Sequence, residues 1–135
     1  MITKPEYFSA WLIKCEEIAI ALSLPLCFAG IDTATGAAFN IDADFPYLKA
    51  DIIFGEEIRP YLDGADGQRY NAITQIAATF PKLQQFAALD TAQSVKDLIP
   101  LDSVVGGTVY NVAISPVIYD NERVIQVVSA TVKTV

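Results

Sequence analysis

The strongest constraint on the fold lies in the last quarter of the chain, where two β-forming segments follow one another. The first runs from Thr108 to Tyr119 after Gly106-Gly107, and the second runs from Arg123 to Thr134. Asp120-Asn121, between them, is a residue pair that favours a tight turn. The two segments therefore predict an antiparallel hairpin, and with it a fold that contains a β-sheet.

Two amphipathic segments predict helices. The first spans roughly residues 4–22, where Thr3 caps the start, Pro5 occupies the first turn and Glu6 completes a capping box. Its apolar stripe comprises Phe8, Trp11, Leu12, Cys15, Ile18, Ala19 and Leu22. The second ends at Pro100, and its apolar residues are Leu83, Phe86, Ala87, Val95, Leu98 and Ile99. The large aromatic residues Phe8, Trp11, Phe80 and Phe86 are expected in the core.

Three further strands are predicted between the helices. Residues 23–28 suit an edge strand because they include Pro25, and residues 45–54 and 70–80 are longer β-forming runs. The segments 30–45 and 55–69 are predicted to be polar loops. The whole chain, residues 1–135, is thus expected to form a single α+β domain. We expect an antiparallel or mixed sheet of four to five strands with two helices packed on one face.

The composition predicts assembly with other subunits. The chain is 53% hydrophobic with a mean hydropathy of +0.36, more apolar surface than a domain of 135 residues buries alone. The alternative explanation is that alanine, which is common at surfaces, raises this figure. A net charge of −7 argues against binding to nucleic acid or to an anionic membrane. The start of the chain does not resemble a targeting segment, and the uncharged run 18–31 is too short to span a bilayer.

Most catalytic arrangements are excluded by residue types. The chain has no histidine, which removes Ser-His-Asp and Cys-His nucleophile systems and every His-containing metal site. Cys15 and Cys27 are predicted to be small core residues, and no glycine-rich phosphate loop is present. We therefore expect a protein that is not an enzyme, with no catalytic residue, no cofactor and no metal. One enzymatic alternative stays open: a pocket lined by carboxylates from among Asp42, Asp44, Asp51, Glu56 and Glu57.

The order of these elements resembles the tail terminator family of long-tailed bacteriophages, also called minor tail or tail completion proteins. The residues that carry the resemblance are the helix from Pro5 to Leu22, then Phe45-Pro46-Tyr47-Leu48-Lys49-Ala50-Asp51-Ile52-Ile53-Phe54. A Gly-rich loop follows, then Gln68-Arg69-Tyr70-Asn71-Ala72-Ile73-Thr74-Gln75-Ile76, a helix and the closing hairpin. The resemblance covers nearly the whole chain, in order and pattern.

The resemblance implies a virion protein, assembled in the host cytoplasm, that forms a ring, usually a hexamer. The ring caps the head-proximal end of the tail tube, stops its polymerisation and joins tail to head. Its partners are other copies of itself, the tube protein and the head–tail connector proteins. A ring needs a heterologous interface, and strand edges and loop residues are its candidates. The candidate interface residues are Glu56, Glu57, Arg59, Tyr61, Asp63, Asp66, Arg69, Tyr119 and Arg123.

Within this set, Arg59, Arg69 and Arg123 are the expected partners for carboxylates of a neighbouring subunit. The alternative functions are a head–tail connector or adaptor subunit, a small enzyme that uses loop carboxylates, and a carrier of a small ligand. A carrier requires an enclosed cavity instead of a flat exposed patch.

Overall fold

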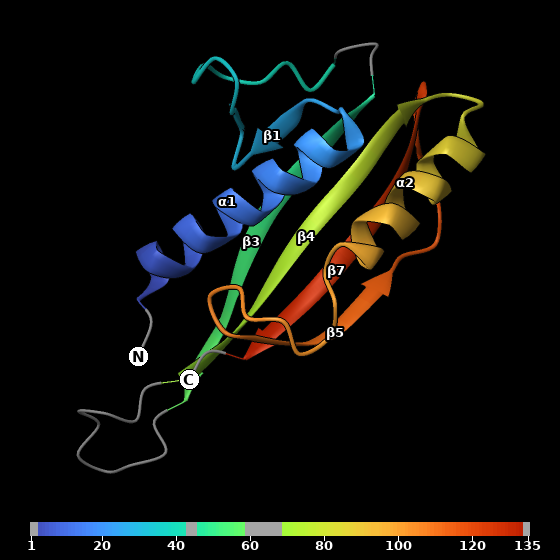
Figure 1. Cartoon of the computed structure of the whole chain (residues 1–135). Helices are drawn as coiled ribbons and strands as arrows, with labels where there is room; N and C mark the ends of the chain where they lie inside the picture. Colours follow the sequence, from blue (N-terminus) through green and yellow to red (C-terminus); the bar gives the residue numbers. More distant parts are fainter. Residues whose placement is uncertain (1–2, 43–45, 59–68, 134–135) are drawn as a thin grey trace.

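The computed structural model describes residues 3–42, 46–58 and 69–133, and within these ranges the chain forms two helices and seven strands (Figure 1). The predicted α+β class is confirmed, but the expected four to five strands are too few. The elements are α1 (Lys4–Leu22), β1 (Leu26–Phe28), β2 (Ile31–Asp32), β3 (Tyr47–Ile58), β4 (Arg69–Pro81), α2 (Gln85–Asp97), β5 (Thr108–Ile114), β6 (Ile118–Asp120) and β7 (Arg123–Lys133).

All seven strands belong to one mixed sheet with the order β2-β1-β3-β4-β7-β5. β6 pairs with the beginning of β7, on the side of β7 where β5 also lies. Only β1 and β3 run parallel, and the other pairings are antiparallel. The predicted edge strand at residues 23–28 corresponds to β1, but β2 lies outside it, within the segment that was expected to be a loop.

The predicted strand from Thr108 to Tyr119 is divided into β5 and β6. Ser115 still donates its backbone N–H to the carbonyl of Val127, but Pro116 follows and has no N–H to donate. The chain therefore leaves the ladder for three residues and rejoins β7 at Ile118. The turn at Asp120-Asn121 then connects β6, not one long strand, to β7.

Helix α1 begins and ends where the sequence predicted. The Thr3 hydroxyl accepts a hydrogen bond from the Glu6 N–H at 3.2 Å, and Ser23, in a left-handed conformation with φ 55°, ends the helix. The buried side chains of α1 are Tyr7, Trp11, Cys15, Ile18 and Ala19.

Helix α2 buries only part of the predicted apolar set: Val95 is buried, and so is Ile99 beyond the end of the helix, but Leu83 and Phe86 are not. Its buried residues are Ala88, Ala92 and Val95, which are spaced as neighbours on one helical face. Phe86 is 84% exposed, so its expected place in the core is wrong, and Leu83 lies before the helix and is 79% exposed. Alanine side chains let the helix axis approach the sheet closely, and the bulkier Phe86 points away.

The core lies between the two helices and one face of the sheet (Figure 1). Along β7 the buried residues alternate with partly exposed ones, as expected for a strand with one covered face. α1 contacts β1 and β3, and α2 contacts β4, β5 and β7. The predicted packing of both helices on one face is confirmed. Neither described helix has the length and apolarity that a bilayer span requires.

Candidate functional site

No described helix covers the sheet face opposite α1 and α2. We call it the open face and define it by the central strands β3, β4 and β7. Strand register aligns its side chains in four rows across the sheet. The rows are Tyr47–Thr79–Ile125, Lys49–Ala77–Val127, Asp51–Gln75–Ser129 and Ile53–Ile73–Thr131.

The open face has apolar residues at six of its twelve row positions. Ile53 is 50% exposed, and Ile73, Ala77, Ile125 and Val127 are partly exposed. Lys49 and Asp51 are the charged members of the four rows. An antiparallel sheet that faces water on one side normally alternates apolar residues inside with polar residues outside. This sheet instead carries apolar side chains on both faces.

One end of the open face contains a partly open hollow of about 210 Å³. Residues from β3, β4 and β7 form its floor, and the segment around Ile41 and the β6–β7 turn form its rim. Its lining residues are Ile41, Tyr47, Lys49, Asp51, Gln75, Ala77, Thr79, Asp120, Arg123, Ile125 and Val127.

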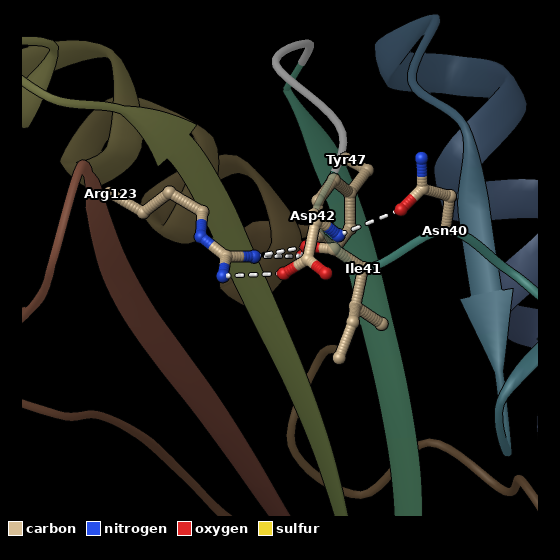
Figure 2. Close-up of polar contacts among 5 residues, drawn as sticks. All are labelled: Asn40, Ile41, Asp42, Tyr47 and Arg123. Carbon is tan, nitrogen blue, oxygen red and sulfur yellow. Dashed lines mark hydrogen bonds and ion pairs between the residues drawn. The ribbon is translucent and has the colours of Figure 1, made fainter.

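Arg123, the first residue of β7, holds the rim together (Figure 2). Its Nη1 donates to the Ile41 carbonyl and, at 3.1 Å, to the Tyr47 hydroxyl, while its Nη2 lies 3.4 Å from the Asp42 carboxylate. The Tyr47 hydroxyl donates to the same Ile41 carbonyl at 2.7 Å. Asn40 accepts the Asp42 N–H at 3.1 Å.

These contacts join segments that are about eighty residues apart in the chain. The ring of Phe39 also packs on that of Tyr47 with 4.9 Å between centroids. The Arg123 side chain is 21% exposed and the Asp42 side chain is 82% exposed, so solvent weakens the ion pair. The hydrogen bonds to Ile41 and Tyr47 are therefore the stronger part of the anchor, and they fix the segment 39–42 over the end of the sheet.

The structure places only part of the predicted interface set. Arg59, Tyr61, Asp63 and Asp66 lie outside the described residues, so their assignment stays a prediction. Arg69 begins β4, and its backbone pairs with Ile58. Arg123, expected to bind a neighbour's carboxylate, is instead engaged within its own chain. No signal in the sequence indicated its partner, because the two segments meet only through the fold.

Glu56 and Glu57 were predicted to lie in a loop, which is wrong. β3 continues through a bulge between Phe54 and Glu57, and β4 begins at Arg69, so both glutamates belong to a strand. The bulge accommodates Gly55, where a Cβ would lie 2.8 Å from the Asn71 carbonyl oxygen. The polarity of Glu-Glu suggested a loop, but pairing with β4 overrides that local preference.

Tyr119, the last of the predicted residues, is 68% exposed on β6 beside Ile118, which is 45% exposed. A second exposed apolar group lies at the start of α2 and consists of Leu83, Phe86 and Leu89. Sequence reasoning missed this group because it assigned Leu83 and Phe86 to the core.

The open face offers limited chemistry in the described chain. Of the carboxylates proposed for an enzymatic pocket, Asp51 lines the hollow and Asp42 forms part of its rim through Arg123. Among the described residues no group of three or more Cys, Asp or Glu side chains is placed to hold a metal ion. Cys15 and Cys27 are buried, as predicted, and burial raises the pKa of both thiols, that of Cys15 to about 12.

Comparison with known proteins supports the fold alone. None of the known protein-family models matches the sequence, nor does any curated protein. One solved structure, of a protein whose name states no function, superposes with a TM-score of 0.72. The superposition covers 98% of this chain and 96% of the other, at 16% sequence identity. The two proteins therefore share the complete fold at low sequence identity.

Proposed function

We propose that this chain is a structural subunit of a bacteriophage tail. Copies of it form a ring of six that caps the head-proximal end of the tail tube, stops tube growth and joins the tail to the head. The observation that carries the proposal is the open face of the sheet, which has apolar residues at six of its twelve row positions and which no described helix covers. The tube, the head and the number six come from the resemblance to tail terminator proteins.

The open face supports an assembling protein on energetic grounds. Apolar surface removed from water contributes about 25 cal/mol per Å², so a face with Ile53, Ile73, Ile125 and Val127 gains by meeting another protein surface. An interface of standard size buries about 800 Å² on each partner. Three strands about 4.8 Å apart with four rows about 6.6 Å apart span roughly 400 Å², so an interface of standard size would also include flanking elements.

The other exposed apolar groups support more than one contact per subunit. Leu83 and Phe86 project from the start of α2, whereas Ile118 and Tyr119 project from β6. A subunit in a capping ring meets a neighbour on each side, the tube below and the connector above. Several separate apolar surfaces on one small domain fit that requirement better than a single binding groove does.

The test begins with the mass and shape of the purified protein. We expect static light scattering to give about six times 14.6 kDa, and negative-stain electron micrographs to show rings. Added to the polymerising tube protein of the same phage, the chain should shorten the tubes and remain at one end. A protein that stays monomeric at high concentration and does not bind tubes would contradict the proposal. Binding to the head connector without binding to tubes would instead indicate an adaptor subunit.

A matched pair of variants separates assembly from folding. Ile73→Lys places a charge in the middle of the open face and should abolish binding to the tubes while the helical circular dichroism persists. Leu101→Lys, at a residue that is 61% exposed and belongs to no row of the open face, is the control and should leave tube binding intact. Equal effects of the two substitutions would show that the open face takes no part in assembly.

A further inference from the structure

Among the strand edges that no other described strand covers, two belong to the longer strands β3 and β5. One is formed by β5, from Val112 to Ile114, and we call it the β5 edge. The other is the outer side of β3 from Asp51 to Ile58, past the end of β1, and we call it the β3 edge. They lie at opposite sides of the same sheet (Figure 1).

The β5 edge presents unpaired backbone groups to the outside. Ser115 donates its N–H to Val127 of β7, and backbone groups alternate sides along a strand. Val112 and Ile114 therefore direct their N–H and C=O groups away from β7. The start of β5 is covered. The Asp102 N–H donates to the Val109 carbonyl, and the Val109 N–H donates to the Ser103 carbonyl. Beyond Val109, no described strand pairs with this side of β5.

The β3 edge follows from the same alternation. The Leu48 N–H donates to the Pro25 carbonyl, and the Ala50 carbonyl accepts from the Ala29 N–H, so both residues direct their backbone groups toward β1. Ile52, two residues further, directs its groups the same way, but β1 has already ended at Phe28. Within the described chain, the backbone of Ile52 therefore has no strand partner on this side.

Free edges of this kind are a hazard that proteins usually suppress with charge, proline or a covering loop. The uncovered part of β5, from Val112 to Ile114, contains no charged residue and no proline, whereas the segment 102–104 covers Thr108 and Val109. This short part of the edge can therefore accept a partner strand.

The strand directions allow one edge to pair with the other in a second copy. β3 and β7 are both antiparallel to β4, so they run the same way, and β5 is antiparallel to β7. β5 and β3 therefore run in opposite directions. A ring whose axis follows the strands preserves the direction of each strand from copy to copy. The β5 edge of one copy then meets the β3 edge of the next in antiparallel orientation.

Charge disfavours one of the two symmetric alternatives. Asp51 is exposed on β3 where the free edge begins, so two β3 edges placed side by side can bring two carboxylates together. The β5 edge is uncharged and accepts an acidic strand without that repulsion. Two β5 edges could also pair, but that arrangement closes a dimer and leaves both β3 edges open.

We propose that the β5 edge of one subunit pairs, antiparallel, with the β3 edge of the next copy of this chain, so that the sheet continues from subunit to subunit around the ring. This inference rests on the proposed ring function and names the contact that builds the ring. Within one subunit, Ala113 pairs with Ser129 and so adds β5 to the row of Asp51, Gln75 and Ser129. Pairing of β5 with the β3 edge of the next copy would continue such rows from one subunit to the next.

Cysteine cross-linking tests the proposal, since a heterologous contact needs two different residues. Ala113 is exposed on the open-face side of β5, and Ile53 is 50% exposed on the same side of β3. In the double variant Ala113→Cys/Ile53→Cys, a short thiol-specific cross-linker should give a ladder of covalent species that ends at the closed ring. Each single variant should give no ladder and no dimer. A second double variant, Ala113→Cys/Asp51→Cys, tests a pairing of the β5 and β3 edges that is shifted by two residues.

The native chain is the control, because Cys15 and Cys27 are buried and should not react. Dimers from the Ala113→Cys single variant would overturn the proposal in favour of paired β5 edges. Rings that assemble in electron micrographs, but whose double variants give no ladder, would overturn the strand pairing and leave the ring function standing. A double variant that stays monomeric while the native chain is also monomeric would contradict both.

Discussion

The hydroxyl oxygens of Tyr7 in α1 and Thr74 in β4 lie 3.2 Å apart in the buried layer between the helices and the sheet. Both side chains are fully buried, and they are 67 residues apart in the sequence. A buried hydroxyl without a partner is costly, so each of these residues makes the other acceptable in the core. The pair fixes the position of the first helix on the face opposite the open one.

The pair predicts a measurable coupling. Tyr7→Phe and Thr74→Val should each lower the free energy of unfolding by about 0.5–1.5 kcal/mol, because each removes the hydrogen bond between the two buried hydroxyls. The double variant should lose less than the sum, since it removes both polar groups together. Urea denaturation of the three variants gives the coupling. Tyr119→Phe, at a 68% exposed residue, is the control and should change little. Strict additivity would show that the two hydroxyls are independent.

Gly106 makes the same helix dependent on the loop before β5. Its φ is +67°, and a Cβ there would lie 2.7 Å from the ring of Tyr7. Gly106→Ala should therefore combine backbone strain of about 1–2 kcal/mol with overpacking of about 1–3 kcal/mol. Gly36→Ala isolates the first contribution, because Gly36 has φ +74° and open space around its Cα. Equal losses of unfolding free energy in the two variants would show that the Tyr7 contact is unimportant.

Elements with strong local signals were predictable from the sequence. The bounds of α1 follow from Thr3, Pro5 and Glu6, whose capping geometry the structure reproduces. The turn at Asp120-Asn121 and the final strand follow from turn chemistry and β propensity. These signals act over a few residues, so the rest of the fold does not alter them.

Features decided by distant contacts were not predictable. β2 has two residues and exists because Cys27 and Phe28 pair with it. Glu56 and Glu57 join β3 because β4 lies alongside. The contact of Arg123 with Ile41 and Asp42 arises only after β7 is placed in the sheet. The open face was not predictable either, because it depends on which side of the sheet the helices cover. The alternation along β7 indicates two faces but does not identify the one that the helices contact.

Two phenylalanines expected in the core should respond in opposite ways to truncation. Phe80 is 7% exposed, and Phe80→Ala should lower the free energy of unfolding by about 3–5 kcal/mol. Phe86 is 84% exposed, so Phe86→Ala should change it by less than about 0.5 kcal/mol. Chemical denaturation measures both. A large loss at Phe86 in a dilute monomer would place this side chain in the core after all.

Substitutions at Arg123 and Asp42 distinguish the contribution of the hydrogen bonds to Ile41 and Tyr47 from that of the surface ion pair. Asp42→Asn should lower the free energy of unfolding by at most about 1 kcal/mol, because the carboxylate is 82% exposed. Arg123→Met removes the donors to Ile41 and Tyr47 and should cost about 1–3 kcal/mol. Amide hydrogen exchange of residues 39–42 should accelerate in Arg123→Met and much less in Asp42→Asn. The reverse order would assign the anchor to the ion pair.

The thiol of Cys15 predicts how stability changes at alkaline pH. Burial raises its pKa from 9.0 to about 12, with a smaller contribution from Glu16. In the folded state the thiol therefore keeps its proton up to about pH 12, whereas in the unfolded chain it loses the proton above pH 9. The stabilisation from this group is complete below pH 9 and is lost as the pH rises toward 12, with a slope of up to about 1.4 kcal/mol per pH unit. Comparing native chain and Cys15→Ala between pH 8 and 11 isolates this slope from that of lysine and tyrosine, and parallel curves would contradict it.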